Sequence, residues 1–297
     1  MRKTVSPGGA GASPAASPAI AFREATGALL PLVESYYLYR HDAARIEGVE
    51  RVDIGQIRFL LRGAGVVTFA DGHSEPTHPV LVNGPWSGAA SYRVDGPFQV
   101  FGVSLRAIGW KALIGLPAHQ VTDRLLDAEV LFGPEAGALL ATLQALQDRP
   151  DAIEAMIAVV EPFLLARRRP VPRAHIALAI AVREWAASPE PRIDALYAAI
   201  DMGPRQVMRL CNEYFGGPPK LLQRKFRAIR AAMRIYQGED PKDVAGPFSD
   251  QPHMINEIRR FTGHTPKTLR DGIDPVLAIT LDNETFHFLP EVIPEAG

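Results

Sequence analysis

Short runs of alternating apolar and polar residues fill the first half of the chain, and turn signals separate them. The runs include VESYYLYR, GQIRFLLR, GVVTFADG, HPVLVNGP and PFQVFGVSL. Turn-forming pairs lie between or within them: Arg62-Gly63, Asp71-Gly72 and Asn83-Gly84. Many short strands at this spacing predict a β-sandwich or barrel between Ala19 and Leu105.

Beyond Leu105 the spacing of apolar residues changes to that of helices. The segments IGWKALIGL, GPEAGALLATLQALQ and DAIEAMIAVVEPFLLAR predict two or three helices after the sheet. The apolar faces over 133–147 and 152–166 suit either the core of this half or a dimer surface. Residues 166–173, ARRRPVPR, are typical of a linker, so the main domain boundary is placed there.

The remaining sequence is almost wholly helical, and a helix pair between Ile193 and Tyr214 is its most informative part. The spacing gives the second helix a buried face and a polar face: Val207, Leu210, Cys211 and Tyr214 on the first, and Arg205, Arg209 and Asn212 on the second. Two helices at a tight turn, with Arg and Asn outward, suit a DNA major groove. An ordinary surface helix pair with a solvated charged face is the alternative.

A long helix is predicted from about Pro219 to Tyr236, and three short helices follow it up to Arg270. Thr265 is a good N-cap for the last of these, with Pro266 at the first helical position. The closing stretch PVLAITLDNETFHFLP predicts two strands around an Asp-Asn turn and fits neither half.

The distribution of charge is more informative than its total. The 297 residues carry a formal net charge of -1 and are enough for about two domains. From Val171 to Arg270 there are 16 Lys and Arg against 10 Asp and Glu. From Pro204 to Arg234 eight basic residues stand against one acid, Glu213. A local basic stripe of this kind favours phosphate binding.

The start of the chain and its single cysteine bear on its compartment. Residues 1–18 are rich in Gly, Ser, Pro and Ala and predict a disordered leader without the apolar core of a signal peptide. No apolar run reaches membrane-spanning length. One cysteine, Cys211, excludes an intramolecular disulfide and is expected to be a buried small hydrophobe. We therefore expect a cytoplasmic protein with no membrane partner.

The sequence DMGPRQVMRLCNEYFGGPPKLLQRKFRAIRAAMRI, followed by DVAGPFSDQPHMINEIRRFTGHTPKTLR, resembles the DNA-binding domain of AraC-family transcription regulators. The resemblance implies two helix-turn-helix units joined by a long central helix, each placing a recognition helix in the major groove. Less specifically, FGVSLRAIGWKALIGLPAHQVTDRL resembles a segment of the cupin-type β-barrel sensors often found ahead of this domain.

The resemblance, together with the chemistry of the bases, implies two sets of DNA contacts. Arg suits guanine, and Asn and Gln suit adenine. The expected base readers are Arg205, Gln206, Arg209 and Asn212 in the first unit and Gln251 and Asn256 in the second. The expected phosphate contacts, which position the protein without reading sequence, are Arg224, Lys225, Arg227, Arg259 and Arg260. A plain solvated helix face is the alternative for Arg224 and Lys225.

The second unit departs from the family pattern, so the first unit is expected to carry most of the specificity. The chain between Ala245 and Phe248 is about two residues short, and its Pro247 lacks the backbone donor of a continuing helix. Pro252 and Asn256 stand where Ser and a basic residue are common in the family. The apolar spacing Met254, Ile258, Phe261 is kept, so the second recognition helix is still expected to form.

The first half offers weaker candidates for chemistry. Aromatic residues gather on its predicted strands, where they could line an effector pocket or form the core. Candidate effector contacts are Arg58, Trp86 and Tyr92, although Arg58 could equally face solvent. His73, Glu75 and His78 lack the spacing of a cupin metal site, so a polar turn is expected, with no metal and no cofactor.

These observations predict an α+β multidomain protein. Its expected parts are a disordered leader over 1–18, a cupin-like β-barrel sensor and dimerisation domain with trailing helices over 19–168, an all-α double helix-turn-helix domain over 169–272 and a β-like tail over 273–297. The expected function is that of a homodimeric transcription regulator, not an enzyme, that binds double-stranded DNA and a small-molecule effector. Two alternatives stay open: a cupin-like enzyme, and an adaptor whose degenerate helix-turn-helix domain has lost DNA binding.

Overall fold

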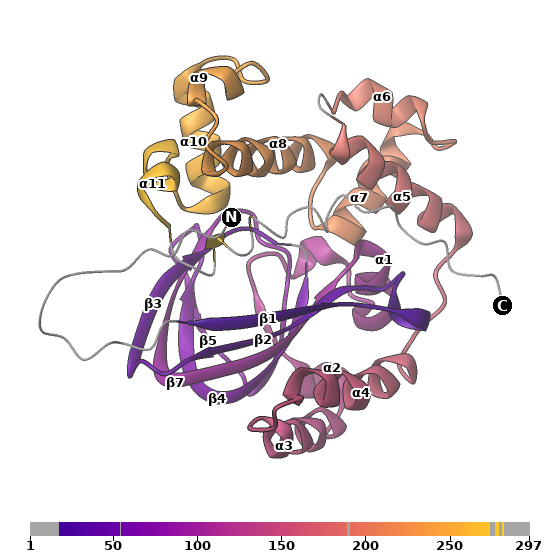
Figure 1. The fold of residues 1–297 in the computed structure, drawn as a ribbon. Coiled ribbons are helices and arrows are strands. Elements are labelled where there is room, and N and C mark those ends of the chain that lie inside the picture. Colours follow the sequence, from indigo (N-terminus) through magenta and orange to yellow (C-terminus); the bar gives the residue numbers. More distant parts are fainter. Residues whose placement is uncertain (1–17, 54, 189–190, 274–276, 279–280, 282–297) are drawn as a thin grey trace, which may run out of the picture.

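An antiparallel sheet forms the first half of the chain and helices form the second (Figure 1), which confirms the predicted fold class. The structure is a computed structural model that describes residues 18–53, 55–188, 191–273, 277–278 and 281. The predicted leader lies outside these residues, apart from Pro18. So does most of the predicted β-like tail, of which the described Leu277, Ala278 and Leu281 are helical.

The strands pair into one curled sheet in the order β1-β2-β7-β4-β6-β8, with β3 on β7 and β5 on β4. Their bounds are β1 Ala19–Glu24, β2 Val33–His41, β3 Arg45–Glu50, β4 Gln56–Thr68, β5 Ser74–Pro76, β6 Val80–Asn83, β7 Ala90–Leu105 and β8 Leu125–Asp127. The paired strands are antiparallel throughout. The long strands β4 and β7 pair with each other along most of their length. They therefore link β1 and β2 on one side of the sheet to β6 and β8 on the other.

The predicted turn at Arg62-Gly63 is wrong, because β4 runs through it as a single strand. The register with β7 shifts on both sides of Arg62, which is the signature of β-bulges. Gly63 has a φ of 79°, a conformation that a bulge can use and that other residues seldom adopt. The two runs GQIRFLLR and GVVTFADG are therefore one bent strand that bends the sheet toward closure.

Alternation along the strands gives the sheet two different faces. On β2 and β4, one set of residues is buried in the core against the trailing helices: Tyr36, Leu38, Ile57, Phe59 and Leu61. The alternate set faces the inside of the curled sheet: Tyr37, Tyr39, Gln56 and Arg58. The inner face thus carries both aromatic rings and polar groups, whereas the outer face is a conventional apolar core.

Helices cover the outer face of the sheet, one of them between β1 and β2 and the others after β7 (Figure 1). These are η1 Gly27–Leu29, α1 Ala107–Gly109, η2 Trp110–Ile114, η3 Ala118–Gln120, α2 Ala128–Phe132, α3 Glu135–Leu146 and α4 Ala152–Leu165. The apolar faces of α3 and α4 are buried in this core through Leu140, Leu143, Met156 and Val160. Of the two alternatives for these faces, the structure shows core packing.

The second half consists of two helix groups at opposite ends of the long helix α8 (Figure 1). The bounds are α5 Arg173–Ala187, α6 Ile193–Ala198, α7 Pro204–Phe215, α8 Pro219–Tyr236, α9 Pro241–Val244, α10 Gln251–Thr262 and α11 Pro266–Asp271. Thr265 caps α11 in a capping box with Thr268, as its sequence predicts. No helix of the described residues is both long enough and apolar enough to cross a membrane.

The two halves share their hydrophobic cores. Residues of α5, α6 and α7 belong to the same buried cluster as the outer face of the sheet. We call the curled sheet and its connecting segments the barrel. At the other end, Ala228 and Ile229 of α8 and Phe261 of α10 join a cluster otherwise built from barrel residues such as Trp86 and Val52. The linker after α4 is also attached, because Arg169 donates from its backbone to the carbonyl of Ala112. The predicted boundary therefore divides the sequence without dividing the core.

Replacing Phe261 with Ala tests this shared core. Phe261 is fully buried between α10 and the barrel, so its loss should lower the free energy of unfolding by about 3–5 kcal/mol. Urea unfolding followed by tryptophan fluorescence and by circular dichroism should give one shifted transition, since Trp86 lies in the same cluster. Val130→Ala, at a residue 83% exposed, is the control and should change stability by about 0.5 kcal/mol or less. Two separate transitions, one of them unshifted, would contradict a common core.

Candidate nucleic-acid interface and barrel pocket

Helix α7 forms because its ends are defined and one of its sides is apolar. Pro204 occupies the first turn, where its missing N–H costs nothing, and Gly216 ends the helix with a φ of 78°. The predicted inner face is confirmed, with each of its four residues fully buried: Val207, Leu210, Cys211 and Tyr214. The Tyr214 hydroxyl lies 2.8 Å from Nδ1 of His175 on α5, and burial raises the pKa of the Cys211 thiol to about 12.

The opposite face of α7 meets solvent. Arg205 and Gln206 are exposed at the start of the helix, and the Arg209 side chain is 62% exposed one turn later. Met208 is also 43% exposed, which is unusual for a large apolar residue. It lies three residues after Arg205, close to one helical turn, so these two side chains share a face of α7. Sequence reasoning missed Met208, although its position in the helical repeat could have revealed it.

One acidic residue ties α7 to the first half of the chain. Glu213 accepts a hydrogen bond from Nη1 of Arg209 at 3.2 Å and another from Nζ of Lys111 on η2. The bond from Lys111, and then the nearby positive charges, lower the pKa of Glu213 below its ordinary value. The hydroxyl of Thr122 also donates to the carbonyl of Gly216 at 3.3 Å. The C-terminal end of α7 is therefore bonded to the barrel half, and its N-terminal end carries the exposed basic residue Arg205.

Two of the predicted phosphate contacts instead bind a buried carboxylate. Nε of Arg224 lies 2.5 Å from Oε1 of Glu257, and Nη2 of Arg227 lies 2.7 Å from Oε2. The Glu257 side chain is only 2% exposed and belongs to α10. Arg227 also donates to the Pro247 carbonyl and packs over the Phe248 ring. These two arginines join α8 to the second helix pair.

Lys225, a third predicted phosphate contact, also bonds within the protein and, unlike the two arginines, is buried. It is 6% exposed, and its Nζ donates to the carbonyl oxygen of Asp53 at 2.8 Å. Asp53 lies in the segment between β3 and β4, so this bond fastens the middle of the helical half to the rim of the barrel. A further basic residue of the stripe, Arg230, donates to the carbonyls of Ser188 and Ala186.

Helix α10, which the sequence predicts to be the second recognition helix, forms despite the short segment before it. Asp250 caps it, accepting from the backbone of His253 at 2.7 Å, and Pro252 falls in the first turn. The core face predicted for it is confirmed, since Met254, Ile258 and Phe261 are fully buried. The candidate readers Gln251 and Asn256 are exposed.

The far end of α10 docks on the barrel. The carbonyl of Phe261 accepts from Val52, and the carbonyl of Arg260 accepts from Ala89. The side chains of Arg259 and Arg260 are exposed beside this junction. Helices α7 and α10 thus both contact the first half of the chain with their C-terminal ends.

The polar turn predicted around His73 is present. His73 is hydrogen-bonded to Asp71, Glu75 pairs with Arg124, and His78 lies 3.9 Å from Asp127. Within the described residues no group of three His, Cys, Asp or Glu side chains is arranged to hold a metal ion.

A cavity of about 160 Å³ lies inside the curled sheet. Its apolar wall comes from β1, β2, β3, β4 and β7, with Leu277 from the C-terminal helical residues: Ile20, Phe22, Tyr39, Val49, Val67, Tyr92, Val94, Phe98, Val100 and Leu277. Arg58 and Tyr92, two of the three candidate effector residues, line it. Trp86, the third, does not, because its ring packs edge-on against Phe69 in the core at 5.6 Å.

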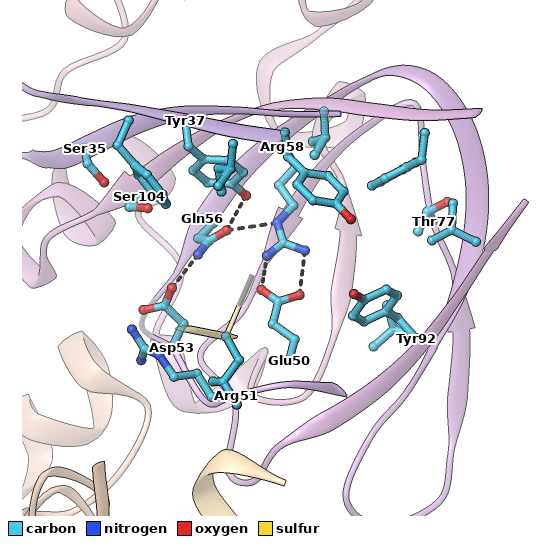
Figure 2. A pocket seen from close by; sticks show the side chains of 18 of the residues that line it. Ser35, Tyr37, Glu50, Arg51, Asp53, Gln56, Arg58, Thr77, Tyr92 and Ser104 are labelled. Atoms are coloured by element: carbon cyan, nitrogen blue, oxygen red, sulfur yellow. Dashed lines mark hydrogen bonds and ion pairs between the residues drawn. The ribbon is translucent and has the colours of Figure 1, made fainter. Parts of the chain in front are cut away.

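A polar cluster occupies one end of the cavity (Figure 2). Nη1 of Arg58 donates to Oε2 of Glu50 at 3.0 Å, Nη2 donates to Oε1, and Nε donates to Gln56 at 2.9 Å. The Tyr37 hydroxyl donates to the same Gln56 oxygen at 2.7 Å, and Gln56 donates to Asp53. Burial raises the pKa of Tyr37 to about 12. Burial alone would lower the pKa of Arg58, but Glu50 raises it above its ordinary value, so the guanidinium stays charged.

Comparison with known proteins gives one family match and a set of similar folds. Residues 24–127 match a family model described as a domain of unknown function, DUF6597. The fold is similar to that of ToxT from Vibrio cholerae O395, with 8% identity and a TM-score of 0.43 over 80% of this chain and 97% of that one. An unsaturated fatty acid-bound ToxT from V. cholerae strain SCE256 gives 10% identity and a TM-score of 0.42 over 77% and 95%. No curated protein matches the sequence.

Replacing Glu257 with Gln tests the structural role of the arginines. Burial alone would raise the pKa of Glu257, but its bonds from Arg227 and Arg224 lower it. Removing the charge leaves two guanidinium groups without their carboxylate, so E257Q should lose roughly 3 kcal/mol of stability at neutral pH. Because the folded pKa is lowered, this difference should persist above the unfolded value of about 4.3 and vanish as pH falls through the folded value.

Urea unfolding of both proteins between neutral and acidic pH measures that difference. Glu154→Gln removes an exposed carboxylate paired with Arg23 and serves as the control, with a small effect expected at every pH. A difference between wild type and E257Q that grows as the pH falls would contradict the assignment.

Proposed function

We propose that this chain is a sequence-specific DNA-binding transcription regulator that reads DNA mainly through α7 and responds to a molecule bound inside the barrel. The observation that carries the proposal is the outward face of α7. It exposes Arg205, Met208 and Arg209 on a helix whose opposite side is fully buried. Side chains near the N-terminus of a recognition helix are those that reach base edges in the major groove.

The chemistry of this face suits a mixed base sequence. Arginine can bond to guanine in a bidentate manner, Gln206 and Asn212 offer the pairing that adenine accepts, and exposed Met208 offers an apolar contact for a thymine methyl group. Before DNA binds, Arg209 is held by Glu213, so reading a base with Arg209 would exchange that surface ion pair for a base contact. Surface ion pairs of this kind are weak, so the exchange is inexpensive.

The length of α8 supports a second, weaker contact. Its 18 residues span about 27 Å and separate the two helix pairs. Successive major-groove segments on one side of DNA are about 34 Å apart. Gln251 and Asn256 on α10 are exposed for the second segment, whereas the nearby Arg224 and Arg227 bind Glu257. With fewer free cations around it, the second unit is expected to add affinity more than specificity.

The segment between β3 and β4 provides a route from the cavity to the DNA-binding half. Glu50, Arg51 and Asp53 line the cavity. The Asp53 carbonyl receives Lys225 of α8, and the backbone of Val52 donates to Phe261 of α10. A molecule that shifts this segment changes contacts with both helices, which is how effector binding would alter the presentation of α7 and α10.

Replacing Arg205 and Arg209 with Ala tests the reading face. Each arginine that reads a base contributes about 1–3 kcal/mol, so the double variant should lose roughly a hundredfold or more in affinity for a selected site. The site comes from binding-site selection with purified wild-type protein, and affinity is measured by fluorescence anisotropy at fixed salt.

The matched control for this pair removes two arginines that the proposal does not use. Arg149 and Arg192 are exposed and pair with neighbouring aspartates, so their double Ala variant loses the same charge. Wild-type affinity in the Arg205 and Arg209 variant, or an equal loss in the control, would overturn the assignment of α7. Failure of the wild-type protein to select any sequence would favour the adaptor alternative.

Lys225→Met separates a buried lysine from a phosphate contact. A lysine that neutralises a phosphate contributes about one to the slope of log affinity against log salt. Because Lys225 bonds to Asp53 inside the protein, K225M should leave this slope unchanged. Anisotropy titrations across a salt series measure it. A slope reduced by about one would show that Lys225 leaves the barrel to bind DNA.

A further inference from the structure

The carboxylate of Glu50, paired with Arg58, lies at the polar end of the barrel cavity and bears on which molecules can bind there. We infer that the cavity binds a neutral, ring-sized molecule with a hydroxyl-type end group and discriminates against free carboxylates and amines. This inference deepens the proposed function by giving the chemical class of the effector. Binding in the cavity can be measured without DNA, so the effector class can be tested independently of the proposed DNA binding.

The size and walls of the cavity set the apolar part of the molecule. A cavity of about 160 Å³ has room for one ring, since an engineered apolar cavity of roughly 150 Å³ binds benzene. Aromatic and aliphatic side chains, among them Phe22, Tyr39, Phe98 and Val100, surround most of it. Aromatic walls favour offset or edge-on contacts with a ring.

The Arg58–Glu50 pair opposes a carboxylate ligand. The guanidinium already holds Glu50 in a two-point pair, and the two side chains are only 17% and 25% exposed. A carboxylate that took Arg58 would leave Glu50 as an uncompensated, largely buried charge, which is costly. The described lining residues also carry three acidic groups, Glu34, Glu50 and Asp53, against the two guanidinium groups of Arg51 and Arg58. Figure 2 places Arg51 beside Asp53, on the far side of Glu50 from the Tyr92 ring.

The same pair disfavours a ligand amine and favours a ligand hydroxyl. An ammonium group bonded to Glu50 would stand next to the charged Arg58, and like charges repel. A hydroxyl both donates and accepts, so it can donate to a Glu50 oxygen and accept from Arg58 without breaking the pair. The three bonds of Arg58 to Glu50 and Gln56 use three of its five guanidinium N–H groups. Its interaction with the Tyr37 hydroxyl uses a fourth, so one donor is left for the ligand hydroxyl.

Three probes that share a ring and differ in charge test the inference. Benzyl alcohol, benzoate and benzylamine are titrated into the full-length protein, with binding followed by calorimetry and by the shift in Tm. Benzyl alcohol should bind and raise the Tm, because a ligand that binds only the folded state stabilises it. Benzoate and benzylamine should bind at least about tenfold more weakly.

A change of one residue should reverse the selectivity. In Glu50→Gln the carboxylate is gone and Arg58 is available to an external anion, so benzoate should gain at least about tenfold in affinity relative to benzyl alcohol. Glu47→Gln, on the same strand but paired with Arg45 outside the cavity, is the matched control and should leave the order of the probes unchanged.

Several outcomes would overturn the inference. Benzoate or benzylamine binding the wild-type protein as tightly as benzyl alcohol would do so, and so would absence of binding by all three probes. Unchanged selectivity in a folded E50Q protein would remove Glu50 as the cause. If E50Q does not fold, the order of the three probes on the wild-type protein still decides the question. Loss of DNA binding in the Arg205 and Arg209 variant leaves these measurements unaffected.

Discussion

The seating of α8 on the rim of the barrel is the contact on which the arrangement of the molecule depends. Ala228 and Ile229 bury apolar surface among barrel residues, and the Lys225 ammonium reaches the Asp53 carbonyl within this seam. Burying a lysine is unfavourable unless its charge finds a hydrogen-bond partner, so the bond fixes where along α8 the barrel can sit. Because α7 and α10 are attached to the two ends of α8, that one position also sets where both of their outward faces lie.

Most of the basic stripe of the second half forms bonds within the protein. Arg224, Lys225, Arg227 and Arg230 bond to a carboxylate or to carbonyls within the protein. Arg205 remains exposed at the start of α7. The carboxylate of Glu257 offsets part of the charge of Arg224 and Arg227, which weakens the positive field that DNA would meet near them. Under the proposed function, recognition would therefore rest on a few side chains, because the charge surplus of the sequence overstates the charge available to a phosphate backbone.

Much of the architecture follows from local patterns. The 3.6-residue period located α5, α7, α8 and α10, and the cap at Thr265 located the start of α11, because these features depend on neighbours in the sequence. The break expected at Gly63 failed for a tertiary reason: glycine signals a bulge as readily as a turn, and only pairing with β7 decides between them. The intramolecular bonds of Arg224 and Lys225 also depend on tertiary structure, since their partners Glu257 and Asp53 lie 33 and 172 residues away. The phosphate contacts expected of these two residues stay predictions.

The sequence by itself determined the strand-rich first half and the helical second half, and the buried and outward faces of α7. It also determined that the segment before α10, with Pro247, is short. Those properties arise from periodicity and from the backbone limits of proline and glycine, which act over a few residues. Only the tertiary structure decided that Arg58 faces a cavity where Glu50 already holds it, and that the two halves share a core. Both depend on which strands and helices meet, and a buried charge takes its partner from whatever the fold brings within hydrogen-bond distance.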